Sequence, residues 1–456
     1  MAAFLPHANG SSSFWRQTPD VLDNHRSTPQ LPTQADIVII GAGYSGGSLV
    51  THVLNDTASQ GKSILVLDAR QLCSGATGRN GGHLKPDAYN LISLYADRYG
   101  IDAAAEVADF EVANISAVRD FVYDNKVDCD FYLTRAVDVQ LDAAHNEKLR
   151  LAHEKLVAKG MKAARDVFYI DGTAAEVISG VNGAKGAFTY TAGHVWPYKM
   201  VHYMFSRALE KGVNLQTNTP VTSIANEQDT QGFTAVETPR GTIRAKQIIV
   251  AANAYTASVL PEFKGRIIPY RGICSHIAPG VHGEKLPVLP NTYAIRFNEK
   301  DFDYLIPRAD GSVVLGGARA AYIRNTESWY GSVDDSQVIQ GVDRYFEGYM
   351  QRHFRGWENS GAKTTAVWSG IMGYSADHSP HIGHVPGRPG VFVMAGFTGH
   401  GMPQIFLAAK GISDMLFGAS FAQTGMPQVF EATASRLASE DNWLAGVIVG
   451  LKQESR

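Results

Sequence analysis

The stretch ADIVIIGAGYSGGSLV at residues 35–50 constrains the fold more than any other feature of the chain. Its apolar, β-branched run at residues 37–40 predicts a strand that is buried on both faces. We expect a helix at residues 48–54 and a second buried strand at residues 63–67, which ends at Asp68. The chain therefore opens with a β-α-β unit of the length that a parallel crossover needs.

Two functional motifs overlap in this stretch. The first is the G-x-G-x-x-G loop of dinucleotide-binding proteins, formed by Gly41, Gly43 and Gly46. Residues 43–47 also match G-x-S-x-G, which presents a nucleophilic serine in hydrolases. Asp68 lies 22 residues after Gly46, near the spacing at which an acid accepts the ribose hydroxyls. We interpret the loop as a dinucleotide site and keep a serine hydrolase acting through Ser45 as an alternative.

The bulk properties of the chain exclude several classes of partner. A net charge of -3, without a run of Lys or Arg, argues against nucleic acid and anionic membranes. No apolar run approaches a membrane span, and we find no targeting signal, so we expect a cytoplasmic protein. The chain has three well-separated cysteines, which fit neither a zinc site nor a disulfide framework: Cys73, Cys129 and Cys274. The histidines of residues 378–384 are broken up by prolines and glycine, so we expect no metal.

The length of 456 residues is sufficient for two or three domains. Alternating strands and helices are interrupted twice by β-rich stretches, which predicts an α/β protein, α+β overall. We expect a Rossmann-like dinucleotide-binding domain interleaved with a β-sheet-rich substrate domain. The expected segments are 35–90, 190–265 and 365–440 for the first domain, 91–189 and 266–364 for the second, with an extended arm at 1–34 and a tail at 441–456. A helix is expected at residues 333–350, capped by Asp334 or Asp335.

A second glycine-rich stretch, GATGRNGG at residues 75–82, follows the acid and bears on the identity of the dinucleotide. Asp68 favours a free ribose 2′-OH, so NAD or FAD rather than NADP. Close backbone approach beyond the pyrophosphate suits a flavin, because its ribityl chain and ring extend past that point. The two loops together favour FAD.

These motifs resemble the D-amino-acid oxidase-like (DAO) FAD-dependent oxidoreductases, the superfamily of glycine and sarcosine oxidases. Residues 75–83, GATGRNGGH, are similar to the γ-glutamylputrescine oxidase branch. Four further matches occur in the family's order, over roughly residues 35–420: KQIIVAANAYT at 246–256, IIPYRG at 267–272, SADHSPHIG at 375–383 and MAGFTGHGM at 394–402. Several matching motifs in order are far more specific than any one of them.

The resemblance implies an FAD enzyme that oxidises a CH–NH bond of an amine or amino acid by hydride transfer to flavin N5, giving an imine and, in an oxidase, hydrogen peroxide. The residues expected to bind the cofactor are Gly41, Gly43, Tyr44, Ser45, Gly46, Asp68, Ala69, Arg70, Ser74, Gly75, Ala76, Thr77, Arg79, Asn80, Gly81, Gly82, His83, Val221, Ala251, Ala252, Gly373, Gly399, His400, Gly401 and Met402. The turn at Gly399–Gly401, with His400, would stabilise negative charge at the flavin N1/O2 edge.

The substrate side has a weaker signature. The residues expected at the flavin edge or in the substrate pocket are His400, Arg271, Tyr304 and Tyr374, with Arg296, Arg308 and Trp368 as further candidates. An arginine there can bind a substrate carboxylate through two hydrogen bonds. Structural ion pairing is the competing interpretation for each of these arginines.

Two departures from the family pattern affect the expected chemistry. Met372 stands where sarcosine oxidase relatives carry the cysteine that attaches the flavin, so we expect non-covalent FAD. Val314 stands where those relatives carry a lysine that activates O2, so a dehydrogenase with another electron acceptor stays open beside an oxidase. An NAD-dependent dehydrogenase and a non-catalytic flavin protein also stay open. The sequence does not determine the substrate, the acceptor or the oligomeric state.

Overall fold

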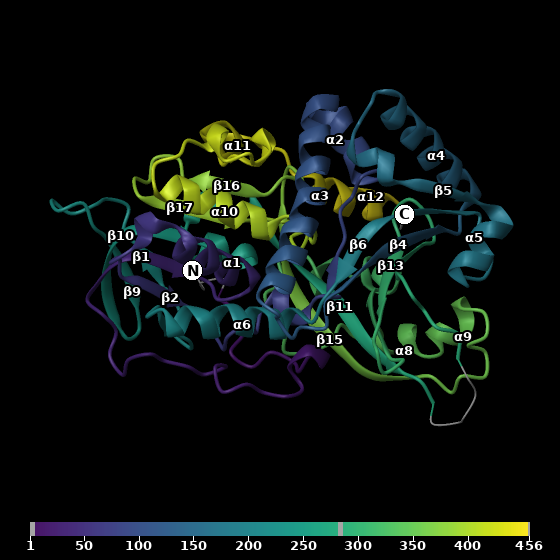
Figure 1. Ribbon diagram of the computed structural model, residues 1–456, viewed down its shortest axis with the longest axis horizontal. Helices are drawn as coiled ribbons and strands as arrows, with labels where there is room; N and C mark the ends of the chain where they lie inside the picture. Colours follow the sequence, from purple (N-terminus) through teal and green to yellow (C-terminus); the bar gives the residue numbers. More distant parts are fainter. Residues whose placement is uncertain (1–4, 281–285, 455–456) are drawn as a thin grey trace.

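Two β-sheets organise the protein, one mainly parallel and one mixed (Figure 1). This computed structural model describes residues 5–280 and 286–454. The first four residues of the expected arm and the last two of the expected tail lie outside the described residues. The fold class predicted from the sequence, a Rossmann-like domain combined with a β-rich one, is confirmed.

The parallel sheet has the strand order β16-β17-β10-β1-β2-β7. Its strands are β1 (Gln34–Ile40), β2 (Ile64–Leu67), β7 (Asn214–Gln216), β10 (Gly241–Val250), β17 (Val391–Ala395) and β16 (His381–His384), with β8 (Ser223–Ile224) and β9 (Thr234–Thr238) beside β10. β1 lies at the centre, and its residues 37–40 are at most 7% exposed. This burial on both faces explains the continuous apolar run. Helix α1 (Tyr44–Asn55) packs against α6 (Pro197–Glu210) and α10 (Ile405–Leu416).

The mixed sheet has the order β15-β11-β14-β13-β12-β4-β6-β3, with β5 on β6. Its strands are β3 (His83–Leu84), β4 (Tyr132–Gln140), β5 (Phe168–Asp171), β6 (Gly186–His194), β11 (Ile267–Ala278), β12 (Thr292–Arg296), β13 (Phe302–Pro307), β14 (Val313–Gly317) and β15 (Lys363–Ser375). The other helices are α2 (Leu91–Tyr99), α3 (Ile101–Asp124), α4 (Ala143–Ala158), α5 (Gly172–Ser179), α7 (Arg319–Tyr322), α8 (Asp343–Phe346), α9 (Tyr349–His353), α11 (Ala434–Ala438) and α12 (Trp443–Glu454).

The two sheets alternate along the chain. The boundaries expected at residues 190 and 365 fall inside β6 and β15, both of which belong to the mixed sheet. The residues near 83 also pair with β6, so the mixed sheet takes one short strand from the expected first domain. We therefore propose that the chain passes between its two domains at the ends of these strands.

Two expected elements differ from the structure. The helix expected at residues 333–350 is wrong: only the short helices α8 and α9 form there. Gly341 and Gly348 have φ values of 83° and 62°, which a continuous α-helix does not allow. The expected tail contains helix α12, which packs against β15. In it the Trp443 indole donates a hydrogen bond of 3.0 Å to the Ser375 carbonyl.

Asp335, expected as a helix cap, is a buried ion-pair partner. Arg70 donates to both of its carboxylate oxygens, at 2.9 and 3.0 Å. Arg79 approaches the same carboxylate at 3.2 Å, and all three side chains are at most 8% exposed. We call these three residues the Arg70–Asp335–Arg79 triad. It joins the glycine-rich loop after β2 to a segment that follows the mixed sheet's β14.

The N-terminal arm is fastened to the same loop. The Ser13 hydroxyl donates to the Gly78 carbonyl at 2.5 Å, and the Trp15 indole donates to the Asn80 carbonyl at 2.6 Å. Arg79 donates to the carbonyl of Ser11. Phe14 stacks on His276 of β11 with ring centroids 4.0 Å apart. The arm thus binds both the loop and the mixed sheet.

Substitution of Asp335 by asparagine is expected to lower the free energy of unfolding by about 3 kcal/mol, because two buried guanidinium groups would lose their counter-charge. Urea unfolding of the Asp335→Asn variant measures this loss. Glu299→Gln is the control, since its pair with Lys148 is more than 60% exposed on both sides and should cost about 1 kcal/mol or less. Equal losses in the two variants would contradict the structural role of the triad.

Candidate active site

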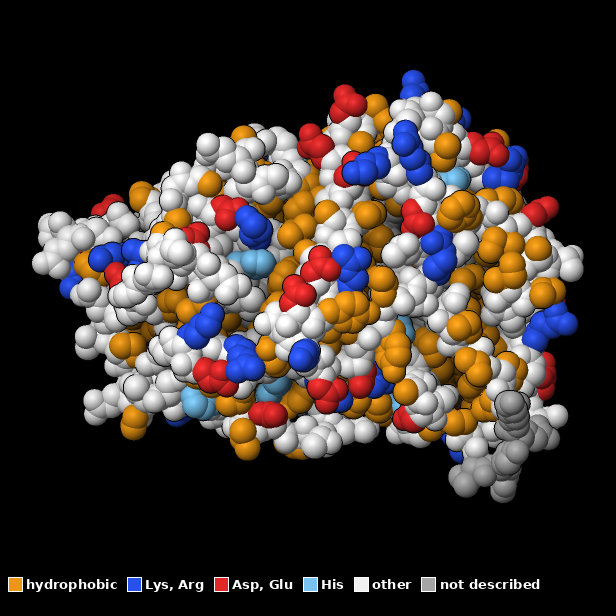
Figure 2. Space-filling view, in the orientation of Figure 1, with side chains coloured by type: hydrophobic (Ala, Val, Ile, Leu, Met, Phe, Trp, Pro, Cys, Tyr) orange, Lys and Arg blue, Asp and Glu red, His pale blue; other side chains and the backbone are white. Residues whose placement is uncertain are grey.

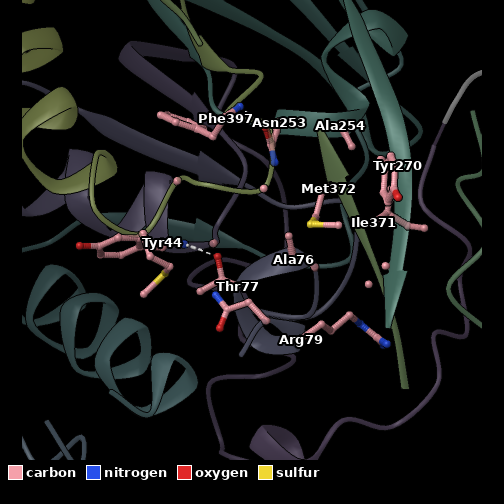
Figure 3. A pocket seen from close by; sticks show the side chains of 18 of the residues that line it. Tyr44, Ala76, Thr77, Arg79, Asn253, Ala254, Tyr270, Ile371, Met372 and Phe397 are labelled. Atoms are coloured by element: carbon pink, nitrogen blue, oxygen red, sulfur yellow. Dashed lines mark hydrogen bonds between the residues drawn. The ribbon is translucent and has the colours of Figure 1, made fainter. Parts of the chain in front are cut away.

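A cavity of about 460 Å³ is lined by residues of both sheets. It extends from the loop after β1 to the inner face of β11, β12, β13 and β15. Figure 3 shows Tyr44, Thr77, Arg79, Asn253 and Met372 around it. Its walls therefore combine the dinucleotide loop with the sheet expected to bind the substrate.

The dinucleotide loop leaves no room for side chains at two of its glycines. Gly41 has a φ of 115°, and a Cβ there would lie 2.5 Å from the Ala251 carbonyl oxygen. A Cβ on Gly46 would overlap the carbonyl oxygen of Gly41. The Tyr44 amide donates to the Thr77 hydroxyl at 3.0 Å, which ties the start of α1 to the second glycine-rich loop (Figure 3). The positive end of α1 therefore faces the cavity, as a phosphate group requires.

Asp68 holds this loop from the end of β2. Its carboxylate accepts hydrogen bonds from the amides of Ala42 (2.7 Å) and Arg70 (2.8 Å). Burial raises the pKa of Asp68 above its usual value, and the two amides act against that shift. Each oxygen has accepting capacity left. Asp68 can therefore orient the loop and still accept a ribose hydroxyl.

The carbonyl groups of the second glycine-rich loop are bound by fixed donors. The Ser74 carbonyl accepts from Arg70 (3.1 Å) and Arg79 (2.9 Å). The Arg79 carbonyl accepts from the Trp368 indole at 2.8 Å. Together with the bonds from Ser13 and Trp15, these contacts set the loop's conformation independently of any ligand.

His400 lies in the turn between β17 and α10 and pairs with a buried acid. Its Nε2 is 3.0 Å from Glu111 Oε2, and Gln404 donates to the other oxygen of Glu111 at 2.7 Å. Glu111 is 2% exposed. Burial alone would lower the pKa of His400, but the Glu111 carboxylate outweighs it and raises the pKa. The turn thus presents a cationic imidazole to the cavity up to a higher pH than a free histidine would.

Tyrosine rings cover the sheet side of the cavity. Tyr270 and Tyr374 stack with centroids 4.3 Å apart at an angle of 18°. The Tyr304 ring lies against Gly81, and its hydroxyl is 3.7 Å from Cys274 Sγ. Burial raises the pKa of Tyr304 and of Tyr374 well above the usual value. These phenols therefore stay protonated and act as hydrogen-bond donors rather than bases.

Most of the predicted site residues line this one cavity. They are Gly41, Gly43, Tyr44, Ser45, Asp68, Ala69, Arg70, Ser74, Gly75, Ala76, Thr77, Arg79, Asn80, Gly81, His83, Val221, Ala251, Ala252, Gly399, His400, Gly401 and Met402, with Tyr304, Tyr374 and Arg296 on the substrate side. Gly46, Gly82 and Gly373 lie behind its wall, where each lets backbone or side chains approach closely.

Arg271, Arg308 and Trp368 are not among the residues that line the cavity. Side chains alternate between the two faces of β11, and Tyr270 and Gly272, on either side of Arg271, line the cavity. The Arg271 side chain is therefore directed away from it. The Arg271 guanidinium instead donates to Ser369 Oγ and to the Gln337 carbonyl. Arg308 pairs with Asp130 at 2.7 Å.

Met372, expected beside the flavin, lines the cavity. Several other lining residues were not predicted from the sequence: Lys85, Asp87, Asn253, Tyr270, Phe302, Arg319 and Tyr322, and Leu5 and Pro6 of the arm. The alternation of side chains along β11 could have predicted that Tyr270 lines the cavity. Asn253 stands in the motif KQIIVAANAYT, and nothing in the sequence pattern marks the others. Glu111 was also missed, and it reaches the site from the middle of α3.

The hydrolase interpretation lacks a base for Ser45. Within residues 5–280 and 286–454, no hydrogen bond joins the Ser45 hydroxyl to a histidine. His52 of the same helix packs on Phe406 instead, with burial lowering its pKa to about 4. Ser45 is 8% exposed in the first turn of α1, where it lines the cavity.

Three further features of the described chain concern binding to membranes, metal ions and charged partners. No helix among the described residues is long and apolar enough to cross a membrane. In the same residues, no group of three or more His, Cys, Asp or Glu side chains is arranged to hold a metal ion. On the face seen in Figure 2, basic and acidic side chains are interspersed rather than separated by sign.

Comparison with known proteins identifies the family. Residues 36–415 match the family model described as FAD dependent oxidoreductase (DAO). The chain belongs to this family. It is therefore an FAD-dependent oxidoreductase, and CH–NH donors are typical of the family.

The individual relatives are distant. The chain is 24% identical to γ-glutamylputrescine oxidoreductase of Escherichia coli K12 over 392 residues, which cover 84% of each protein. It is 22% identical over 392 residues to a probable oxidoreductase, OrdL, of Haemophilus influenzae, covering 84% of this chain and 83% of that one. The fold is similar to that of glycine oxidase from Geobacillus kaustophilus, with a TM-score of 0.66 and 17% identity over 87% of this chain and 99% of that one.

The cavity fits the FAD that the family implies. The glycines at 41 and 46 bring the backbone close to where a pyrophosphate binds, and Asp68 is placed for a ribose. Ala251 and Ala252 follow β10 at the adjacent strand end. The turn at residues 399–402 brings the His400 imidazole, paired with Glu111, to the same cavity.

The His400–Glu111 pair predicts a pH dependence in the protein without cofactor. Because the folded pKa of His400 is raised, its stabilising contribution is complete below about pH 6.5 and is lost as the pH rises through the folded pKa. Urea unfolding between pH 6 and pH 9 should show a smaller loss of stability in His400→Gln than in the wild type. His25→Gln, at a histidine outside the cavity, should follow the wild-type profile. Identical profiles for all three proteins would contradict the assignment.

Proposed function

We propose that this protein oxidises the CH–NH bond of an amine or amino acid and passes the electrons to O2. The observation that carries the proposal is the single cavity shared by the dinucleotide loops and the tyrosine-lined sheet face. Bound FAD would supply the hydride acceptor of the reaction. The chain's own residues hold the cofactor, position the amine and exclude water.

The residues of the cavity suit this reaction. Tyr304 and Tyr374 act as hydrogen-bond donors and apolar walls, as their raised pKa values require. Oxidation of a neutral amine by hydride transfer needs no obligatory acid–base residue. The cationic His400 would stabilise negative charge that develops on the cofactor's edge during the reaction.

We infer that the FAD is held without a covalent bond. Met372 pairs with Tyr270 across β15 and β11 and lines the cavity, and its thioether cannot form a thioether link to a flavin. Cys274 also lines the cavity, but burial raises the pKa of its thiol to about 12. A protonated thiol is a poor nucleophile. Cys73 is buried and is not among the lining residues.

A dehydrogenase that uses another electron acceptor is the second candidate. Val314, at the position where oxidase relatives carry lysine, is fully buried in the core and does not line the cavity. Lys85 is a cation that does line it. Lys85 could replace the missing lysine and so supports an oxidase. The valine at position 314 favours a dehydrogenase.

One experiment, carried out in successive steps, tests the proposal. The purified protein should show flavin absorption, and acid precipitation should move the colour into the supernatant. A panel of amines and amino acids, added without oxygen, should include compounds that bleach the flavin, and readmitted oxygen should restore the colour with formation of peroxide. Glycerol and simple alcohols serve as control substrates.

Each outcome has a separate meaning. Colour that stays in the precipitate would contradict non-covalent binding. Bleaching by alcohols but by none of the amines would contradict CH–NH oxidation. Bleaching by an amine that oxygen does not reverse, but a quinone does, would select the dehydrogenase.

A further inference from the structure

The N-terminal arm supplies part of the cavity wall. Leu5 and Pro6 line the cavity, and the three residues that follow them are exposed. We call residues 5–11 the arm tip. The tip forms an outer wall, with the cavity on one side and solvent on the other. The family match begins at residue 36, so this wall lies outside the part of the chain that matches the family.

Hydrogen bonds hold the arm tip beside the end of β2. The His7 carbonyl accepts from Arg70 Nη1 at 3.0 Å. The amide of the same arginine donates to Asp68, the acid placed for a ribose, at 2.8 Å. The amide and the hydroxyl of Ser11 each donate to the Asp335 carbonyl at 2.8 Å. The tip therefore lies close to the position of the ribose.

A donor without a partner lies at the same end of the cavity. Tyr255 lines the cavity, and its hydroxyl is buried with no hydrogen-bond partner in the described part of the chain. Burial raises the pKa of Tyr255 well above its usual value, and the charged groups that act on it are Arg70, Asp335, Arg79 and Asp68. A protonated phenol without an acceptor is unfavourable in the interior, so this end is complete only with a ligand that brings acceptor oxygens. The ribose and the phosphates of a nucleotide carry such oxygens.

The arm tip is attached more loosely than the rest of the arm. Phe14 and Trp15 are 8% and 1% exposed, so they anchor the arm in the core. The exposed residues of the tip bury little surface, and the tip depends on a few hydrogen bonds at its two ends. A segment of this kind opens locally at a low cost in free energy. The tip can therefore open while the anchor stays in place.

We propose that the arm tip binds the adenosine half of FAD through Leu5 and Pro6 and encloses it. Apolar side chains of this kind pack on the faces of a planar base and remove them from water. Asp68 accepts from the ribose hydroxyls, and Tyr255 donates to an oxygen of the same half. This role is independent of the substrate, because it concerns the cofactor alone. The tip must open before the cofactor leaves, so it slows the release of FAD.

The two halves of the cofactor, used as separate probes, test the proposal. The probes are ADP and FMN, and titration calorimetry measures their binding to the full-length protein after FAD has been removed. Leu5→Gln should weaken the binding of ADP roughly three- to tenfold, because an apolar contact is lost, and should leave the binding of FMN unchanged. Ala8→Gln is the matched control, since Ala8 belongs to the same tip but is exposed and is not among the lining residues. It should bind both probes as the wild type does.

A shortened chain that begins at Asn9 removes the wall as a whole. It lacks Leu5, Pro6 and the contact of His7 with Arg70, but it keeps Ser11 and the anchor. The loss of ADP affinity should be roughly tenfold or more, again without a change for FMN. The FAD-loaded form gives an independent readout. On dilution it should release FAD roughly tenfold faster than the wild type, followed by the rise in fluorescence of free flavin, because most differences in affinity lie in the rate of dissociation.

Two results would overturn the inference. One is a wild-type affinity for ADP in both Leu5→Gln and the shortened chain. The other is an equal loss of ADP and FMN binding, which would show that the tip does not act on the adenosine half. The melting temperature of each variant without ligand reports its folding, and Leu5→Gln decides the test if the shortened chain is unstable. The failure of amines to bleach the flavin would contradict the proposed function alone, because none of these measurements uses an amine.

Discussion

The ion pairs of Asp335 with Arg70 and Arg79 fix the geometry on which the rest of the structure depends. They join the loop after β2 to the segment after β14, and the Ser11 hydroxyl adds the arm by donating to the Asp335 carbonyl. Buried charges of this kind contribute less to stability than to the choice of one arrangement. Here that arrangement is the glycine-rich loop, in which side chains hold four carbonyl groups before a ligand binds, those of Ser74, Gly78, Arg79 and Asn80.

The cavity is a consequence of that arrangement. One wall comes from a parallel sheet whose strand ends and helix N-terminus suit a dinucleotide. The other wall comes from a mixed sheet whose inner face carries tyrosines, Arg296 and the residues around Asp138. The polar groups of the cavity include the His400–Glu111 pair at the cofactor turn and Arg296 at the end of β12. The same fold thus supports a redox cofactor and a substrate site with different electrostatic requirements.

Local motifs were the part of the site that the sequence could predict. Glycine loops and the acid after β2 depend on short-range geometry, so their spacing carries the information. The pairing of Lys85, Asp138 and Arg296 depends on strands that are far apart in sequence, and no pattern marks it. Arg271 looked equivalent to Arg296 in the sequence, but strand alternation turns it away from the cavity. Asp335 resembles a helix cap in the sequence, but the positive φ values of Gly341 and Gly348 break the helix that it would cap.

The arm was predicted as an extended segment, but its contribution to the site was not predicted. Gly10 lies against the Arg70–Asp335–Arg79 triad. A Cβ at this position would lie within 3.0 Å of Arg70 Nη1 and Asp335 Oδ1. Titration of FAD into the cofactor-free Gly10→Leu variant therefore tests most directly whether the arm and the triad complete the cofactor site. We predict at least a tenfold loss of FAD affinity, with Gly446→Leu, at an open position on α12, unchanged. Wild-type affinity in Gly10→Leu would contradict the account.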